Sequence, residues 1–272
     1  MGNPMSLFDI VMLALIQGIT EFLPVSSSGH LALWPILTGR PDQGVSMDVA
    51  VHLGTLAAVC LYFRRETGVL AAGLGDLARG RRATQPARLF LLIALATIPA
   101  ILAGLALKVS GALESLRAIE VIGWTTLLGG ILLWLGDRIG AETRGFGEWG
   151  LRDAVLMGLA QALALVPGTS RSGITMTMAR FLGFGRTDAA RVSMLMAIPV
   201  ILAAGVLEIL GLIRDGNLAV TAELGLAALL SFIAALAALA VMMRMFASDW
   251  TMGPFAIYRL GLGAVLLWLA YA

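Results

Sequence analysis

The sequence predicts an all-α polytopic membrane protein with six transmembrane helices and two re-entrant helical hairpins, arranged as an inverted-topology repeat. Three observations predict this class. The 272 residues are 59% hydrophobic and only 13% charged, which is about half the charged share of a soluble globular chain. Six apolar stretches approach or exceed the length that crosses a bilayer. Two similar polar motifs interrupt further apolar stretches that are too short to span.

The six predicted spans are read from the length of the apolar runs. A helix needs about 20 apolar residues to cross the hydrocarbon core. The runs are 47–63, 89–109, 118–136, 192–213, 222–243 and 254–271. Eleven of the 32 glycines lie inside these runs, which suits helices that pack closely in lipid.

Each predicted hairpin is a short apolar segment that runs into a proline and a cluster of small polar residues. The first joins 10–25 to 31–38, and the second joins 154–167 to 174–184. A half-length helix, a loop and a second half-helix describe a hairpin that enters and leaves the membrane on one side. Irregular backbone at that depth is tolerated only where protein or a water-filled cavity surrounds it.

The two hairpins also resemble each other. The first reads QGITEFLPVSSSGH from Gln17, and the second reads QALALVPGTSRSGI from Gln161; both place Gln eleven residues before a Ser-Gly pair. Each copy holds one hairpin and three spans, so the second copy (about 150–271) must be inverted relative to the first (about 6–136). We expect a single domain, residues 1–272, with a site where the copies meet. The alternative, a chance match, is disfavoured by the shared spacing and element order.

The arginines predict the orientation. Connection 64–88 holds six of them and is therefore cytoplasmic by the positive-inside rule. Alternation places 137–153 on the same side and 110–117 and 214–221 outside. In this topology both termini are outside, the first hairpin opens to the outside and the second opens to the inside. The single Cys60 provides no disulfide framework, and a net charge of +2 is too small to suggest nucleic acid.

Glu21 is the first candidate for a functional group. A carboxylate in an apolar segment costs several kcal/mol unless it is paired or hydrated, and Gln17, one turn earlier, faces the same side. The alternative is an interfacial anchor at a helix end. Asp48 and His52, four residues apart at the start of the first span, either line the mouth of the cavity or are interfacial, and the interfacial interpretation is favoured. Glu208 is interpreted as hydrated near the outer end of its span.

The serine cluster that follows suggests an anion site. Ser26, Ser27, Ser28 and Gly29 precede a half-helix whose N–H groups and dipole attract phosphate or carboxylate. A serine hydroxyl attacks phosphorus when a base takes its proton, and His30 lies three residues after Ser27, on the same helix face. The alternative is that the serines only cap the helix and His30 packs.

The second hairpin supplies a cation. Arg171 lies between Ser170 and Ser172 in an apolar region, where a guanidinium needs an anionic partner. Arginine binds phosphate bidentately and stabilises charge in phosphoryl transfer. If the repeats meet, Glu21, the serines, His30 and Arg171 form one pocket. The alternative is an ion pair that only holds the hairpins together.

Together, QGITEFLPVSSSGH and PGTSRSG resemble the motifs of the bacterial undecaprenyl pyrophosphate phosphatases linked to bacitracin resistance, over essentially the whole chain. The resemblance implies hydrolysis of undecaprenyl pyrophosphate to undecaprenyl phosphate and inorganic phosphate. It also implies an active site on the outer, periplasmic side of a bacterial cytoplasmic (inner) membrane, a divalent cation and the occurrence of homodimers. The acidic motif falls on Gln17 and Glu21. Many members have two glutamates there, so Glu21 is the main acidic group of this chain.

The resemblance also implies roles for the motif residues. Ser27, His30, Glu21 and Arg171 are the expected catalytic residues, Gln17 and Gln161 support them, and Glu21 binds Mg²⁺ or Ca²⁺. The expected phosphate-binding residues are Ser26, Ser28, Gly29, Ser170, Ser172 and Gly173. Ser27 is the expected nucleophile with His30 or Glu21 as base, but His30 or a metal-activated water remains open as the attacking group.

Two other classes of protein remain as alternatives. Inverted repeats with re-entrant hairpins are typical of transporters and lipid flippases, and an intramembrane serine protease also uses serine and histidine. The cluster is more than an ion site needs, and Arg171 beside the serines suits an anionic substrate better than a peptide.

Overall fold

The computed structural model describes residues 6–39, 43–214, 216 and 221–272, and the elements in this part are helices. Their bounds are α1 Leu7–Thr20, α2 Ser27–Thr38, α3 Val45–Tyr62, α4 Arg64–Ala78, α5 Gln85–Ser110, α6 Ala112–Ser115, α7 Ile119–Ile139, the 3₁₀ turn η1 Phe146–Glu148, α8 Leu151–Leu163, α9 Arg171–Phe181, α10 Arg186–Arg214, α11 Ala222–Ala247 and α12 Gly253–Tyr271.

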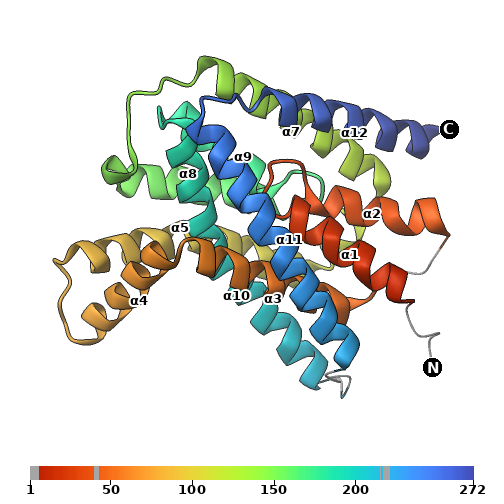
Figure 1. Ribbon diagram of the computed structural model, residues 1–272, viewed down its shortest axis with the longest axis horizontal. Coiled ribbons are helices and arrows are strands. Elements are labelled where there is room, and N and C mark those ends of the chain that lie inside the picture. Colours follow the sequence, from red (N-terminus) through yellow and green to blue (C-terminus); the bar gives the residue numbers. More distant parts are fainter. Residues whose placement is uncertain (1–5, 40–42, 215, 217–220) are drawn as a thin grey trace.

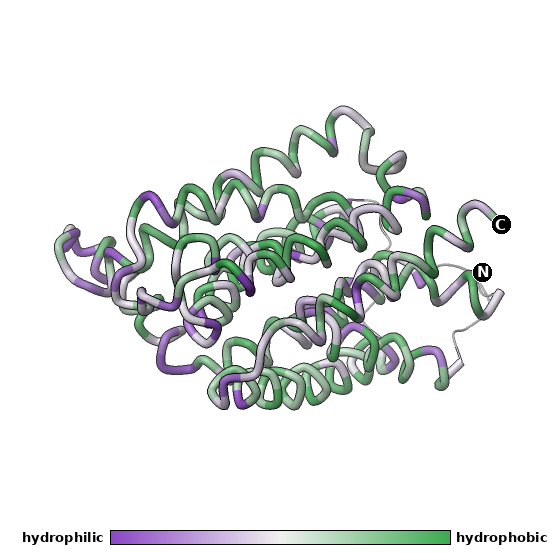
Figure 2. The backbone as a smooth tube through the Cα atoms, turned by 90° about the horizontal axis from the view of Figure 1, so that it is seen from above, coloured by the Kyte–Doolittle hydropathy of each residue, from purple (hydrophilic) through white to green (hydrophobic). Residues whose placement is uncertain are grey.

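Six of these helices are long and apolar enough to cross a membrane: α3, α5, α7, α10, α11 and α12. They correspond to the six predicted spans, which confirms a multi-pass, all-helical membrane protein. Their ends lie within a few residues of the prediction, except that α10 begins six residues earlier. Hydrophobic residues run along most of the helices, and hydrophilic residues gather mainly near helix ends (Figure 2). Large apolar side chains such as Ile257 and Trp268 face outward, as expected of a surface that lies in lipid.

The connection 64–88 differs from the prediction, because it contains helix α4. This helix packs on α5, and Figure 1 shows it projecting with the first turns of α5 at one end of the molecule. Leu70 and Gly73 form the buried face, where a Cβ on Gly73 would lie 2.2 Å from the carbonyl oxygen of Pro86. The segment is too polar to register as a span, and a search for spans therefore misses an amphipathic helix of this length.

The two predicted hairpins are helix-turn-helix units, α1–α2 and α8–α9. The helices are 14, 12, 13 and 11 residues long. At 1.5 Å per residue none reaches the roughly 30 Å of a hydrocarbon core. Within each unit the two helices contact each other. The polar motifs lie in the turns, 21–26 and 164–170, and in the first residues of α2 and α9.

Helix pairing brings the two halves of the chain together. The helix α7 packs along α12, and α3 packs on α10, while α1 lies against α11 and α8 lies against α5. Small residues permit close contact in the last two pairs. A Cβ on Gly18 would lie 2.6 Å from the carbonyl oxygen of Ser231, and one on Gly158 would lie 2.7 Å from that of Ala96. The two turns therefore meet inside the bundle.

Candidate active site

The two turns have the same local geometry. Ser26 and Ser170 are the N-caps of α2 and α9, with positive φ values of 77° and 66°. Each hydroxyl accepts a hydrogen bond from a glycine N–H three residues on, from Gly29 at 3.3 Å and from Gly173 at 3.1 Å. A positive φ is costly for a residue other than glycine and persists only where the surroundings enforce it. These caps are therefore held in place by the fold.

Hydrogen bonds cross from one turn to the other. The Gly168 N–H donates to the Ser28 hydroxyl at 3.0 Å, and the Ser172 hydroxyl donates to the Leu23 carbonyl at 2.9 Å. The fully buried Arg259 of α12 reinforces the second turn, because its guanidinium donates to the carbonyls of Gly168 (3.0 Å) and Thr169 (2.8 Å). The turns are thus fixed relative to each other.

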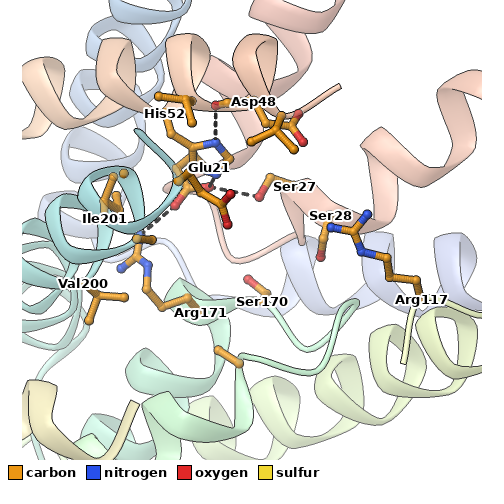
Figure 3. Close-up of a pocket in the computed structure, with 16 residues that line it drawn as sticks. Glu21, Ser27, Ser28, Asp48, His52, Arg117, Ser170, Arg171, Val200 and Ile201 are labelled. Atoms are coloured by element: carbon orange, nitrogen blue, oxygen red, sulfur yellow. Dashed lines mark hydrogen bonds and ion pairs between the residues drawn. The ribbon is translucent and has the colours of Figure 1, made fainter. Parts of the chain in front are cut away.

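Glu21 is the centre of the resulting cluster. Its Oε2 accepts hydrogen bonds from the Gln17 amide at 2.9 Å and from the Ser27 hydroxyl at 3.0 Å. Its Oε1 lies 3.3 Å from the guanidinium of Arg171, 150 residues away in the chain. Figure 3 shows Ser27 and Arg171 converging on this carboxylate from the two turns. The structure therefore brings together the acidic, serine and arginine motifs.

Burial makes this ion pair consequential. The Glu21 and Arg171 side chains are 8% and 11% exposed. Removing one member of a buried pair leaves the other charge uncompensated and typically costs about 3–5 kcal/mol. Arg171 is held further by donating to the Ser193 carbonyl at 3.2 Å. The guanidinium is therefore fixed before any ligand arrives.

The cluster opens into a cavity with two lobes. One lobe, of about 350 Å³, lies beside Glu21, Arg171 and the apolar side chains of α3 and α10. The other, of about 370 Å³, lies beside α2 and the start of α7. Both lobes are lined by the same five residues, Ser27, Ser28, Asp48, His52 and Arg117. A polar seam between apolar walls fits a molecule with a charged head and a hydrocarbon tail.

Several predicted site residues do not line either lobe. The His30 ring nitrogens contact the Ser26 carbonyl at 2.7 Å and the Tyr258 hydroxyl at 2.6 Å, and the ring stacks on Tyr258. Gln161 is buried and donates to the Ala96 carbonyl.

The predicted phosphate-binding residues divide into two groups. Ser28 and Ser170 line the cavity. The remaining four, Ser26, Gly29, Ser172 and Gly173, are outside the lining and bond within or between the turns. This placement favours a role in holding the turns over the predicted phosphate contact.

Other polar residues of the cavity lie outside the two motifs. Asp48 and His52 line both lobes, as the alternative to the favoured interfacial interpretation expected, and His52 Nε2 lies 3.9 Å from Glu21 Oε2. Arg117 belongs to the connection 110–117, which the sequence predicts to lie outside, and it also lines both lobes. Glu208 was placed near the outer end of its span and also lines the first lobe. Arg259 lies inside the apolar run 254–271, where an arginine is itself a signal of function or structural necessity.

Comparison with known proteins agrees with these motifs. A family model described as bacitracin resistance protein BacA matches residues 10–265. The chain belongs to the BacA family. Relatives named undecaprenyl-diphosphatase include those of Ruegeria pomeroyi and Jannaschia sp., each 53% identical over 98% of this chain and 100% of the relative. The undecaprenyl-diphosphatase 1 of Rhodospirillum rubrum is 47% identical over 98% of this chain and 96% of the relative.

In the described part of this BacA-family chain, the acidic residues do not form a protein-only metal cage. In the part of the chain that the structure describes, His, Cys, Asp and Glu side chains form no group of three suited to hold an ion. Glu21 is the carboxylate of the cluster, and Gln17 occupies the neighbouring position as an amide. Mg²⁺ is commonly bound by one or two carboxylates together with substrate phosphates. The donor set therefore fits a cation that enters with a phosphorylated ligand.

Proposed function

We propose that this chain is a membrane-embedded phosphatase that hydrolyses undecaprenyl pyrophosphate to undecaprenyl phosphate and inorganic phosphate. The reaction recycles the lipid carrier for peptidoglycan and other envelope polymers and confers bacitracin resistance. The observation that carries the proposal is the contact of Ser27 and Arg171 with Glu21 inside a cavity that has apolar walls. The names of the relatives support the same substrate.

Ser27 is the nucleophile in this proposal, and Glu21 is its base. As the Ser27 oxygen forms a bond to the terminal phosphorus, Glu21 accepts the hydroxyl proton along the existing 3.0 Å hydrogen bond. The bond between that phosphorus and the bridging oxygen breaks, and the departing undecaprenyl phosphate takes the electron pair and the proton from Glu21. Water then attacks the phosphoserine and gives a proton to Glu21, which returns it to the Ser27 oxygen as phosphate leaves.

The geometry favours Glu21 over His30 as the base. Both ring nitrogens of His30 contact other groups, and neither lies in the lining of the cavity. The phosphohistidine route would require His30 to leave its contacts with Ser26 and Tyr258. His30 in this proposal fixes the start of α2, where Ser27 is the first residue.

A pyrophosphate needs two cationic contacts, and the cavity offers two arginines. Arg171 lies beside Glu21 and Ser27, where the terminal phosphate would react. Arg117 lines both lobes, where the phosphate that carries the lipid would lie, and Figure 3 shows its side chain at the first of them. Arginine suits this role because its planar fork matches phosphate oxygens.

A divalent cation, Mg²⁺ or Ca²⁺, belongs to the proposal because Glu21 offers hard oxygen ligands. Glu21 would hold it together with the oxygens of the pyrophosphate. Bound there, the cation would neutralise charge that develops on the phosphates.

The membrane arrangement is also part of the proposal. We place α1–α2 and α8–α9 as re-entrant hairpins of an inverted repeat, supported by their length, their identical caps and the reciprocal packing of α1 on α11 and α8 on α5. The arginine-rich connections would then face the cytoplasm, and the cavity would open to the outer side of the inner membrane. The homodimer that the resemblance implies stays a prediction, which the mass of the detergent-solubilised particle tests.

Phosphate release by the purified protein in detergent tests the function. With undecaprenyl pyrophosphate and Mg²⁺ or Ca²⁺, wild type should release phosphate, and Ser27→Ala should release almost none while unfolding at a similar temperature. If folded wild type releases no phosphate with either metal, the phosphatase proposal fails. Transport of a phosphorylated lipid would then be the better account of the same cavity, and it would require a sealed membrane to measure.

A further inference from the structure

A second cavity, of about 420 Å³, lies between α4, α5, η1 and α10. None of its lining residues lines either lobe of the candidate active site. The α4 residues of this cavity follow the C-terminal end of α3. The candidate active site uses Asp48 and His52 from the first half of α3. The cavity is therefore a separate feature at the arginine-rich end of the bundle.

The rim of this cavity is basic. Arg65, Arg88 and Arg191 line it together with one acid, Glu66. Arg191 pairs with Glu66 and lies over the ring of Phe146, 4.6 Å from its centroid. Arg65 and Arg88 are exposed, and no ion pair or hydrogen bond to either side chain occurs among the described residues. The lining therefore carries two cations that have no internal counter-charge.

The floor of the cavity is apolar. Val69, Leu89, Leu92, Phe146 and the almost fully buried Trp149 form it. The helix α4 carries Arg64 and Arg65 in its first turn and exposes the apolar side chain of Leu74 further along. A short amphipathic helix with basic residues is typical of a segment in the headgroup region of a membrane. Arginines near that surface attract anionic lipids.

We propose that this cavity binds the headgroup of an anionic phospholipid, with the phosphate between Arg65 and Arg88 and the first carbons of the acyl chains on the apolar floor. A free phosphate would satisfy the arginines but leave the floor open, whereas a lipid matches both parts. The site does not depend on the proposed phosphatase reaction, because the two sets of lining residues are separate.

Thermal unfolding of the full chain in an uncharged detergent tests this site. The unfolding temperature would be followed by tryptophan fluorescence with added phosphatidylglycerol, phosphatidylcholine or inorganic phosphate at equal concentrations. A ligand that binds only the folded state raises this temperature by mass action. The double variant Arg65→Gln/Arg88→Gln removes the free cations of the rim. Arg138→Gln/Arg152→Gln removes two exposed charges from the flanking ends of α7 and α8 and serves as the matched control.

We expect phosphatidylglycerol to raise the unfolding temperature of wild type and of the control by several degrees more than phosphatidylcholine does. The rim variant should lose most of that difference. Native mass spectrometry should likewise show retained phosphatidylglycerol in wild type and the control but not in the rim variant. Equal responses of the two double variants would overturn the site, because the effect would then reflect general surface charge. A full response to inorganic phosphate alone would overturn the assignment of a lipid.

Discussion

Replacing Arg117 by glutamine separates substrate recognition from folding. Arg117 is exposed, and no hydrogen bond or ion pair to its side chain occurs in the described residues. Its loss should therefore change the free energy of unfolding by no more than about 0.5 kcal/mol. A hydrogen bond to a charged group contributes roughly 1.5–3 kcal/mol. If Arg117 holds the second phosphate, Arg117→Gln should raise KM for a prenyl pyrophosphate roughly 10- to 150-fold.

Steady-state hydrolysis in detergent measures this effect. KM should rise for Arg117→Gln while kcat changes little, because the lost contact acts on bound substrate and transition state alike. Arg171→Gln should instead lower kcat, and Arg152→Gln, which removes an exposed charge from the N-terminal end of α8, should match wild type. A KM within twofold of wild type would refute the assignment of Arg117. A fall in kcat without a change in KM would mean that Arg117 contacts the phosphate only in the transition state.

Three further results are expected. Ser27→Ala should lower kcat by at least about 10³-fold, whereas His30→Gln should lower it less than about tenfold, because the His30 nitrogens are engaged outside the cavity; equal losses would favour the phosphohistidine route. Gly168→Ala should destabilise the fold by about 2–4 kcal/mol. The reason is that the φ of Gly168 is +89° and a Cβ there would lie 2.2 Å from Thr125 Oγ1. An unchanged unfolding temperature would contradict the proposed rigidity of the turn. Asp153 is the pH-sensitive case: burial alone would raise its pKa, but hydrogen bonds from Arg144 and the Gly150 N–H hold the pKa below its usual value. The stability that wild type gains relative to Asp153→Asn should therefore be fully present above about pH 4. It should be lost as the pH falls through the lowered pKa. An equally large difference in unfolding temperature at pH 2 would contradict this pH dependence.

The spans could be predicted because a bilayer imposes one dominant requirement, an apolar run of sufficient length. This requirement identifies α3, α5, α7, α10, α11 and α12 from composition alone. The same criterion fails for α4, whose stability depends on packing against α5 through Leu70 and Gly73. The stability of a short amphipathic helix depends on the elements that pack against it. A search for apolar runs contains no information about that packing.

The central cluster could be predicted because its members are unusual for their surroundings. A carboxylate and a guanidinium in apolar segments each require a partner of opposite charge. The sequence therefore predicts contact between Glu21 and Arg171, which lie 150 residues apart in the chain. His52 lies in the first half of α3 and Arg117 lies two residues before α7. Only the packing of α3 and α7 around the turns brings them into the cavity.

His30 shows the opposite case. Its spacing from Ser27 suggested a shared helix face, but α2 begins at Ser27 itself. The orientation of its first turn is set by the Ser26 cap and by Tyr258 of α12. Spacing along a helix predicts which residues are neighbours, but it does not predict where the helix is rotated in the fold.

The matching caps explain why the proposed chemistry needs both halves of the chain. Ser26 and Ser170 hold their turns in the same way, and each has a second serine hydroxyl at 3.2 Å, Ser28 and Ser172. The residue directly after the cap differs, being Ser27 in one turn and Arg171 in the other. Two copies of the first turn would place nucleophiles together without a cation, and two copies of the second would place like charges together. Because Glu21 accepts hydrogen bonds from both of these residues, the functional cluster exists only where the two turns meet.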